Sequence, residues 1–145
     1  MPFAQHVLLV DDKSDVRGVL RAVLARFHPN ATVVEASNGA EALLAFGEQR
    51  PDLIITDYQM PVMSGLELLH TLRSQGETLP ILLLSSDPSI ADVLLAEGAS
   101  AFLPKPFPYG TMRDLLRTSL PESEQAQAVG VQAGAHGQHA VLGAV

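Results

Sequence analysis

The chain has 145 residues, enough for one domain with a substantial core, and 47% of them are hydrophobic while 17% are charged. It contains no cysteine, which excludes disulfides, thiolate metal sites and a cysteine nucleophile. The formal net charge is −7, and the 9 lysines and arginines are scattered before residue 121. Direct nucleic-acid binding needs a basic patch, so this distribution argues against that function.

The sequence gives no indication of a targeting or membrane segment. Residues 1–6 have no positive region ahead of an apolar stretch, so they are not interpreted as a signal peptide. No apolar run approaches the ~20 residues that a membrane-spanning helix needs. We therefore expect a soluble, cytoplasmic protein without a membrane partner.

The first apolar run, residues 6–10, predicts a buried strand that ends at an acidic pair, Asp11 and Asp12. Ser14 is the expected N-cap of a helix that ends before Pro29.

Apolar residues recur along this helix at i, i+3 and i+4, which indicates one face turned to a core. They are Val16, Val19, Leu20, Val23, Leu24 and Phe27. Arg17 and Arg21 lie off that face and are expected in solvent.

The middle of the chain repeats the pattern of strand and helix. A strand is expected over 32–36 and a helix over 40–49, with Ala42, Leu43 and Phe46 turned inward. The run 53–57 is apolar until Asp57 ends it, which is typical of a strand buried on both faces of a parallel sheet. A helix over 65–74 follows, with Leu66, Leu69 and Leu72 apolar.

The last part of the core adds two strands and two helices. Residues 80–84 predict a strand that ends at Ser85, and a helix over 89–97 stops at Gly98, a residue suited to a left-handed cap. A short strand over 101–103 leads to Lys105. A helix over 108–120 then places Met112, Leu115, Leu116 and Ser119 on one side. Five strands alternating with five helices predict an α/β fold, a doubly wound parallel sheet with helices on both faces.

From residue 121 the composition changes to Ala, Gly, Gln and His without a strong helical or strand period. Such a segment cannot build a second core, so we expect a flexible tail over 121–145 after a domain over 1–120. His136 and His139 form a weak metal pattern there, and a solvated tail is the better interpretation.

Polar side chains follow four of the five predicted strands: Asp11 and Asp12, Asp57, Ser85, and Lys105. The carboxyl ends of parallel strands lie at one edge of a sheet, where such folds bind ligands. Singly, each residue is explained as a turn, cap or surface residue. Together, three carboxylates repel each other unless a cation lies among them, which favours a hard divalent ion such as Mg²⁺.

Four stretches, V-L-L-V-D-D, V-V-E-A-S-N-G-A-E-A-L, P-D-L-I-I-T-D-Y-Q-M-P-V-M-S-G and F-L-P-K-P-F, occur in an order and spacing that resemble the receiver domain of two-component response regulators. The resemblance covers residues from about 6 to 120. It implies a flavodoxin-like sheet with the strand order 2-1-3-4-5, either as a single-domain regulator or as the receiver of a hybrid histidine kinase.

The resemblance also implies the roles of individual residues. Asp57 would accept a phosphoryl group, and Asp11 and Asp12 would hold Mg²⁺ together with Asp57 and the backbone carbonyl of Gln59.

Ser85 would bond one phosphoryl oxygen and Lys105 would pair with another. Phe102 lies where the family carries a switching aromatic, often Tyr, so a switch here would lack the phenolic hydroxyl. The Lys105–Pro106 bond would be cis.

The implied function is a phosphoacceptor module rather than an enzyme, with slow loss of its own aspartyl phosphate. Its phosphodonor would be a histidine kinase or a histidine phosphotransfer protein. Its output would be a downstream protein bound through the fourth helix, fifth strand and fifth helix, or onward phosphotransfer, with phosphorylation-dependent dimerisation left open.

Two alternatives use a similar α/β sheet. An aspartate-nucleophile phosphatase needs D-x-D after its first strand, whereas this chain has D-D-K and, after the third strand, D-Y-Q. A flavin-binding protein needs a phosphate-cradling loop where Asp11 and Asp12 would repel phosphate. Both are weaker than the receiver interpretation.

Overall fold

Short runs of Val, Ile and Leu form the five strands of the computed structural model, which describes residues 5–120. They are β1 (His6–Val10), β2 (Thr32–Ala36), β3 (Leu53–Asp57), β4 (Ile81–Ser85) and β5 (Ala101–Pro104). All pairings are parallel and the order is β2-β1-β3-β4-β5. The predicted doubly wound sheet is therefore confirmed, and β3 lies at its centre.

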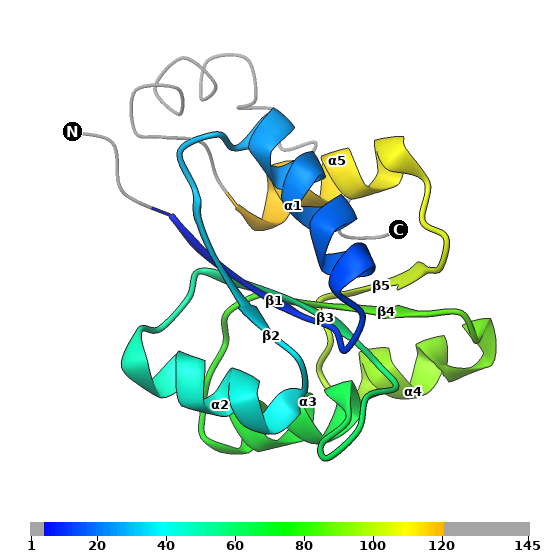
Figure 1. Cartoon of the computed structure of the whole chain (residues 1–145). Coiled ribbons are helices and arrows are strands. Elements are labelled where there is room, and N and C mark those ends of the chain that lie inside the picture. Colours follow the sequence, from blue (N-terminus) through cyan, green and yellow to red (C-terminus); the bar gives the residue numbers. More distant parts are fainter. Residues whose placement is uncertain (1–4, 121–145) are drawn as a thin grey trace, which may run out of the picture.

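Helices cover both faces of this sheet (Figure 1). On one face are α1 (Ser14–Phe27) and α5 (Tyr109–Ser119), and on the other are α2 (Gly39–Glu48), α3 (Gly65–Ser74) and α4 (Ala91–Ala96). Because each crossover returns the chain to a parallel strand, all strand ends that precede a helix meet at the same edge of the sheet.

Alternate residues of the central strands belong to two separate cores. Leu9 and Ile55 pack with α1 and α5, whereas Leu8 and Ile54 pack with the other three helices. Every residue of β3 and of β4 is buried, including the polar strand ends Asp57 and Ser85. A strand buried on both faces is a rigid support for the group at its end.

The start of α3 is held by a capping box in which the Ser64 hydroxyl accepts from Glu67 N–H and the Glu67 carboxylate accepts from Ser64 N–H. Its end turns at Gly76, where φ is +87°. Leu68 is fully buried beside Leu69, so the inward face of α3 is wider than the predicted stripe. Leu66 is only partly buried.

The predicted helix over 89–97 is divided in the structure. Asp87 caps a 3₁₀ turn, η1 (Pro88–Ile90), and α4 begins only at Ala91. Proline at the first position of the turn fixes φ and donates no hydrogen bond, which suits a tight start. Gly98 ends α4 with φ +111°, as predicted.

The helix α1 differs from prediction at three positions. Its N-cap is Lys13 rather than Ser14, because the Asp11 carboxylate accepts Lys13 N–H at 2.9 Å and holds that residue extended. Val19 is 55% exposed, since it lies at the edge of the apolar stripe, about 100° around the helix from Leu20. Arg17, predicted in solvent, has a side chain that is only 16% exposed.

The other boundaries agree with prediction within one residue at each end. Within residues 5–120, no helix has the length and apolarity to cross a membrane. The predicted tail over 121–145, with His136 and His139, lies outside the described residues.

Candidate functional site

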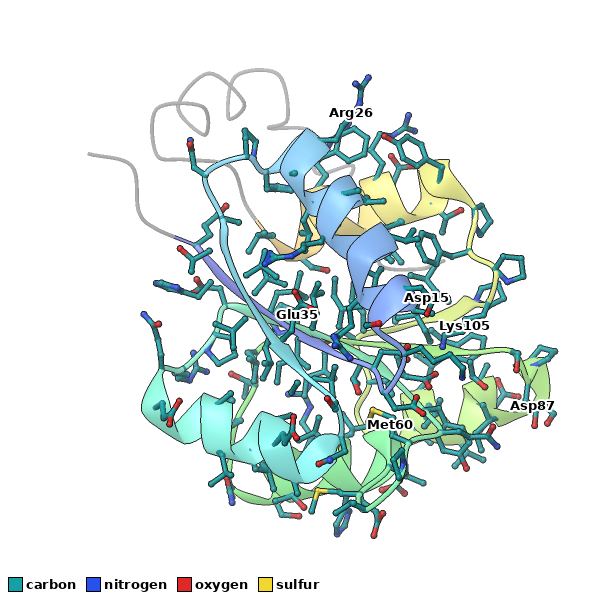
Figure 2. All side chains as sticks on the ribbon, in the orientation of Figure 1. Asp15, Arg26, Glu35, Met60, Asp87 and Lys105 are labelled. Atoms are coloured by element: carbon teal, nitrogen blue, oxygen red, sulfur yellow. The ribbon has the colours of Figure 1, made fainter. Side chains whose placement is uncertain are left out.

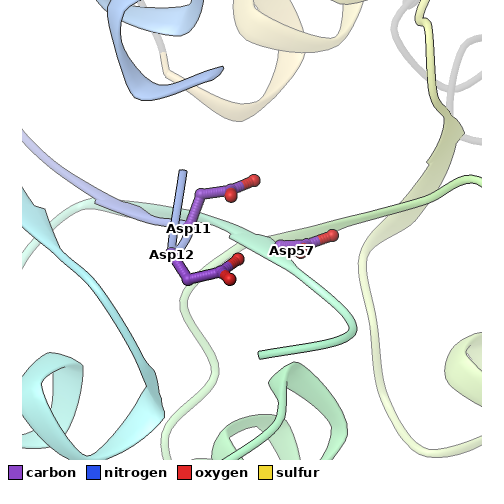
Figure 3. Close-up of side chains that lie close together, drawn as sticks. All are labelled: Asp11, Asp12 and Asp57. Atoms are coloured by element: carbon purple, nitrogen blue, oxygen red, sulfur yellow. The ribbon is translucent and has the colours of Figure 1, made fainter. Parts of the chain in front are cut away.

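Three carboxylates meet at the edge of the sheet where the strands end. Figure 3 shows Asp11 and Asp12 leaving the end of β1 and Asp57 leaving the end of β3, with their carboxylates turned to the same side. One ligand oxygen from each lies within 4.8 Å of the others. Asp11 and Asp57 are buried while Asp12 is exposed, so the group is open to solvent on one side.

The pairing of β3 with β4 fixes the backbone of Asp57. Asp57 is paired in register with Leu84 of β4, and Tyr58 N–H continues the ladder to the Leu84 carbonyl at 2.9 Å. The Thr56 hydroxyl donates to the Asp57 carbonyl at 3.0 Å. Only 6% of Asp57 is exposed, which leaves its carboxylate little freedom to move.

The loop after Asp57 folds back against the strand end. Gly65 N–H donates to the Tyr58 carbonyl at 2.8 Å, and a Cβ at Gly65 would collide with the Asp57 carbonyl oxygen. Gly39 N–H donates to the Met63 carbonyl at 3.0 Å, which ties the loop to the start of α2. Glycine at position 65 is therefore needed for the close approach of α3 to the site.

Lys105 joins two of the three carboxylates. Its Nζ lies 3.0 Å from Asp11 Oδ2 and 2.9 Å from Asp57 Oδ1. Lys105, labelled in Figure 2, also donates through its backbone N–H to the Ser85 carbonyl at 3.0 Å. The Lys105–Pro106 bond is cis, as predicted.

Burial and charge act on these groups in opposite directions. Burial raises the pKa of Asp57, and the nearby Asp11 charge raises it further, although the hydrogen bond from Lys105 lowers it in part. Burial alone would lower the pKa of Lys105, but the hydrogen bonds and charges of Asp57 and Asp11 outweigh it, so this pKa is raised. Lys105 therefore stays an ammonium ion at neutral pH.

The residues present fit a divalent cation. Three carboxylates against one ammonium leave a local excess of two negative charges when all are ionised. All the clustered donors are oxygens, the ligand type that Mg²⁺ prefers and that soft metals do not. Burial is the main cause of the raised pKa of Asp57, and a cation here would relieve the further contribution of the Asp11 charge.

Ser85 lies at the end of β4 and is 3% exposed. Its hydroxyl oxygen accepts Asp87 N–H at 3.0 Å, so the strand end is tied to the turn before α4. Phe102, paired with Leu83 in register, is partly buried against the core that contains α3 and α4. Gln59, two residues after Asp57, is exposed.

Arg17 lies near the site, a position that its sequence pattern does not predict. Arg17 donates through Nη1 to the Asp11 carbonyl oxygen at 2.6 Å and through Nε to Glu35 Oε1 at 2.7 Å. Its place off the apolar stripe suggested solvent, and only the pairing of β1 with β2 brings Glu35 within reach.

A parallel five-stranded sheet with an acidic cluster and a lysine at its strand ends is typical of the receiver domains of response regulators. The response regulator receiver domain family matches residues 7–117, and the chain belongs to that family.

Curated relatives include response regulator MprA of Mycobacterium ulcerans (strain Agy99), 40% identical over 131 residues, which are 86% of this chain and 56% of the relative. Response regulator MprA of Mycobacterium bovis (strain BCG / Pasteur 1173P2) is 42% identical over 124 residues, 81% of this chain and 53% of the relative. This chain therefore spans about half the length of these relatives.

Among solved structures, chemotaxis response regulator CheY4 of Vibrio cholerae is 34% identical with a TM-score of 0.70, covering 81% of this chain and 100% of its own. A co-crystal structure of the Saccharomyces cerevisiae histidine phosphotransfer signaling protein Ypd1 and the receiver domain of its downstream response regulator Ssk1 matches at 25% identity and a TM-score of 0.70. That match covers 82% of this chain and 90% of the other. Both support the receiver fold found here.

Proposed function

We propose that this chain accepts a phosphoryl group on Asp57 from a phosphohistidine of a histidine kinase or a histidine phosphotransfer protein. The observation that carries the proposal is the position of Asp57, buried at the end of the central strand between an acidic pair and Lys105. Ypd1 and Ssk1 give a precedent for the second kind of donor in a protein of the same fold.

In the transfer, an Asp57 carboxylate oxygen forms a bond to phosphorus while the bond from phosphorus to the donor imidazole nitrogen breaks. The electron pair of that bond stays on the imidazole, which then takes up a proton from solvent. Negative charge spreads over the phosphoryl oxygens as this happens. Lys105, already 2.9 Å from Asp57 Oδ1, is placed to pair with one of them.

Asp11, Asp12 and Asp57 are the side chains that would hold Mg²⁺, with the backbone carbonyl of Gln59 as a further oxygen ligand. When bound, the cation would offset the charge of the carboxylates and of the incoming phosphoryl group. The exposed side of Asp12 leaves room for the donor to approach.

The phosphoryl group would be read through Ser85 and Phe102. Reversing a two-state equilibrium from about 1:99 to 99:1 takes ~5.5 kcal/mol. A charge-assisted hydrogen bond from the Ser85 hydroxyl contributes roughly 1.5–3 kcal/mol. An ion pair between Lys105 and the phosphoryl group is worth about 4 kcal/mol at an effective dielectric constant of ~20. Only part of this is gained, because Lys105 already pairs with two carboxylates.

Movement of Ser85 toward the phosphoryl group would leave space beside β5, and Phe102 could turn inward to fill it. The surface of α4, β5 and α5 would then change its affinity for a downstream protein or for a second copy. On this proposal residues 1–120 form the working receiver, and residues 121–145 take no part in phosphotransfer.

The phosphatase alternative is not favoured by the family match. The test is to incubate the protein with Mg²⁺ and acetyl phosphate and to follow intact mass and phosphate ester turnover in parallel. The proposal predicts one phosphoryl adduct per chain, lost on Asp57→Asn and on chelation of the metal, without multiple turnover of an unrelated phosphate ester. Steady turnover of the ester without an adduct would instead support a hydrolase.

A further inference from the structure

We infer that Arg17 is a positioning residue for the acidic pair, and that it sets the affinity of the site for its divalent cation. The inference rests on the metal site of the proposed function and concerns a residue that bonds the backbone of Asp11 rather than its carboxylate. It is carried by the contacts of one guanidinium group.

The Arg17 guanidinium bridges two elements and the start of the acidic pair. Its Nη1 donates to the Asp11 backbone carbonyl at 2.6 Å, and its Nε donates to Glu35 Oε1 at 2.7 Å. The Arg17 side chain is 16% exposed, and its bond to the Asp11 carbonyl is partly buried, whereas its bond to Glu35 faces solvent. A planar fork of donors held at two points has a fixed orientation.

The anchor for this fork is β2, where Figure 2 labels Glu35. Glu35 is paired in register with Leu9 of β1, and it also forms an ion pair with Arg21, whose Nε lies 3.0 Å from Glu35 Oε2. Arg21 belongs to the same helix and pairs with the same carboxylate, but its side chain is 50% exposed. The two arginines therefore differ in the bond to the Asp11 carbonyl, and Arg21 is a matched control.

The Asp11 carbonyl belongs to the peptide group that joins Asp11 to Asp12. Asp11 N–H donates to the Ala36 carbonyl at 3.1 Å, which fixes the entry to this residue. The bond from Arg17 fixes the orientation of the peptide group between Asp11 and Asp12, and hence the direction of the backbone at Asp12. Because Asp12 is exposed, this peptide plane restrains where its carboxylate lies relative to the other two.

A ligand set held in place before binding loses less conformational entropy when the cation arrives. Residues that orient metal ligands typically change metal affinity by 10–100-fold when removed. Since Arg17 acts through a backbone carbonyl, we expect the lower end of that range.

The charge of Arg17 has the opposite effect. The positive charge of Arg17 repels Mg²⁺. If charge were its only effect, a neutral residue at position 17 would therefore strengthen Mg²⁺ binding. The direction of the change in affinity therefore separates positioning from charge.

The test is calorimetric titration of Mg²⁺ into the full chain and into the variants Arg17→Gln, Arg17→Lys and Arg21→Gln, with thermal unfolding as a check on folding. We expect the Mg²⁺ Kd to rise about tenfold in Arg17→Gln and severalfold in Arg17→Lys, which keeps the charge but loses the fork. Arg21→Gln should stay within about twofold of the parent. The Mg²⁺ concentration for half-maximal labelling by acetyl phosphate should rise by the same factors, with the maximal rate unchanged.

Equal or tighter Mg²⁺ binding by both Arg17 variants would overturn the inference and leave the proposed function intact. An equal loss of affinity in Arg21→Gln would also overturn it, because the effect would then belong to Glu35 pairing in general. A parent chain that binds no Mg²⁺ would instead contradict the proposed metal site itself. If Arg17→Gln does not fold, Arg17→Lys decides alone.

Discussion

The carboxylate of Asp57 lies in a buried environment that destabilises its ionised form. Burial and the neighbouring Asp11 raise its pKa above the ordinary value near 3.8, even though Lys105 lies against it. The folded protein therefore binds a proton at Asp57 more readily than the unfolded chain does. At neutral pH and without metal, the ionised Asp57 lowers the free energy of unfolding.

The first prediction follows from that sign. In chelator at pH 7, Asp57→Asn should unfold at a higher urea concentration than the parent, because the variant no longer buries this charge. As pH falls through the raised pKa of Asp57 toward 3.8, the parent becomes protonated there and the difference should vanish. Paired urea titrations from about pH 7 to pH 4 measure it.

Asp12→Asn is the control, since Asp12 is exposed and its removal should change stability less. A difference between parent and Asp57→Asn that grows as the pH falls would contradict the assigned direction. Saturating Mg²⁺ should stabilise the parent more than Asp57→Asn, because the variant lacks one ligand.

Val62 is a second residue held in an unfavourable state. Its φ is +70°, its side chain is 81% exposed, and Met63 N–H donates across it to the Pro61 carbonyl at 2.7 Å. A β-branched residue in this conformation costs of order 1–3 kcal/mol. The local sequence does not predict a positive φ at Val62, because β-branched residues normally avoid that conformation.

Val62→Gly should raise the free energy of unfolding by about 1 kcal/mol, since relief of strain exceeds the added entropy of the unfolded chain. Val19→Gly is the matched control: this valine is also exposed, but it lies inside α1, where glycine should lower stability by roughly 0.5 kcal/mol. Chemical denaturation measures both. Equal losses in the two variants would mean that the Val62 turn is not strained.

Most of the site could be predicted at the residue scale because it depends on strand ends. Asp11, Asp57 and Lys105 follow short apolar runs, and parallel topology brings such positions together. Arg17 could not be found in this way. Its burial depends on a contact with Glu35 of another element, and hydrophobic periodicity carries no information about such a contact.

At the scale of elements, the close approach of α3 to β3 rests on one glycine. A Cβ on Gly65 would collide with the Asp57 carbonyl oxygen and lie 2.8 Å from Leu83 Cδ2. Both neighbours belong to fully buried strands, so neither can move without disturbing the centre of the sheet.

Gly65→Ala should therefore lower the free energy of unfolding by about 1–3 kcal/mol, the usual cost of overpacking, and displace Asp57. Gly18→Ala provides the contrast, because a Cβ at Gly18, inside α1, would meet nothing within 4 Å. Alanine there should raise stability by up to about 1 kcal/mol. Equal stability of the two alanine variants in urea would show that α3 does not need glycine at position 65.

Element boundaries were predictable where apolar periodicity and caps agree, as in α3 with Ser64 and Glu67. They were less so after β4, where Asp87 and Pro88 form a 3₁₀ turn that residue spacing cannot separate from a helix. The N-cap of α1 is Lys13 rather than the predicted Ser14. The Asp11 side chain, expected from the sequence to bind metal, also accepts Lys13 N–H.

At the scale of the whole molecule, the core of the described residues extends to Leu120. This residue is fully buried with Leu116 against the α1 face of the sheet. A chain ending at Leu120 should match the full chain in melting temperature and labelling rate. Removing Leu120 as well should cost roughly 1.5–3 kcal/mol, the value of one buried leucine.

Thermal unfolding of the two truncated chains beside the full chain measures this step. A fall of many degrees on removal of residues 121–145 alone would show that the domain extends past residue 120, against the division proposed here.

If Asp57 alone accepts the phosphoryl group, mapping the position of the adduct should find it there and nowhere else. After labelling with acetyl phosphate and Mg²⁺, borohydride reduction converts an aspartyl phosphate to homoserine, which peptide mass analysis locates by position. We expect homoserine at position 57 of the parent and at no position of Asp57→Asn. Homoserine at Asp11 or Asp12, or undiminished labelling of Asp57→Asn, would contradict this expectation.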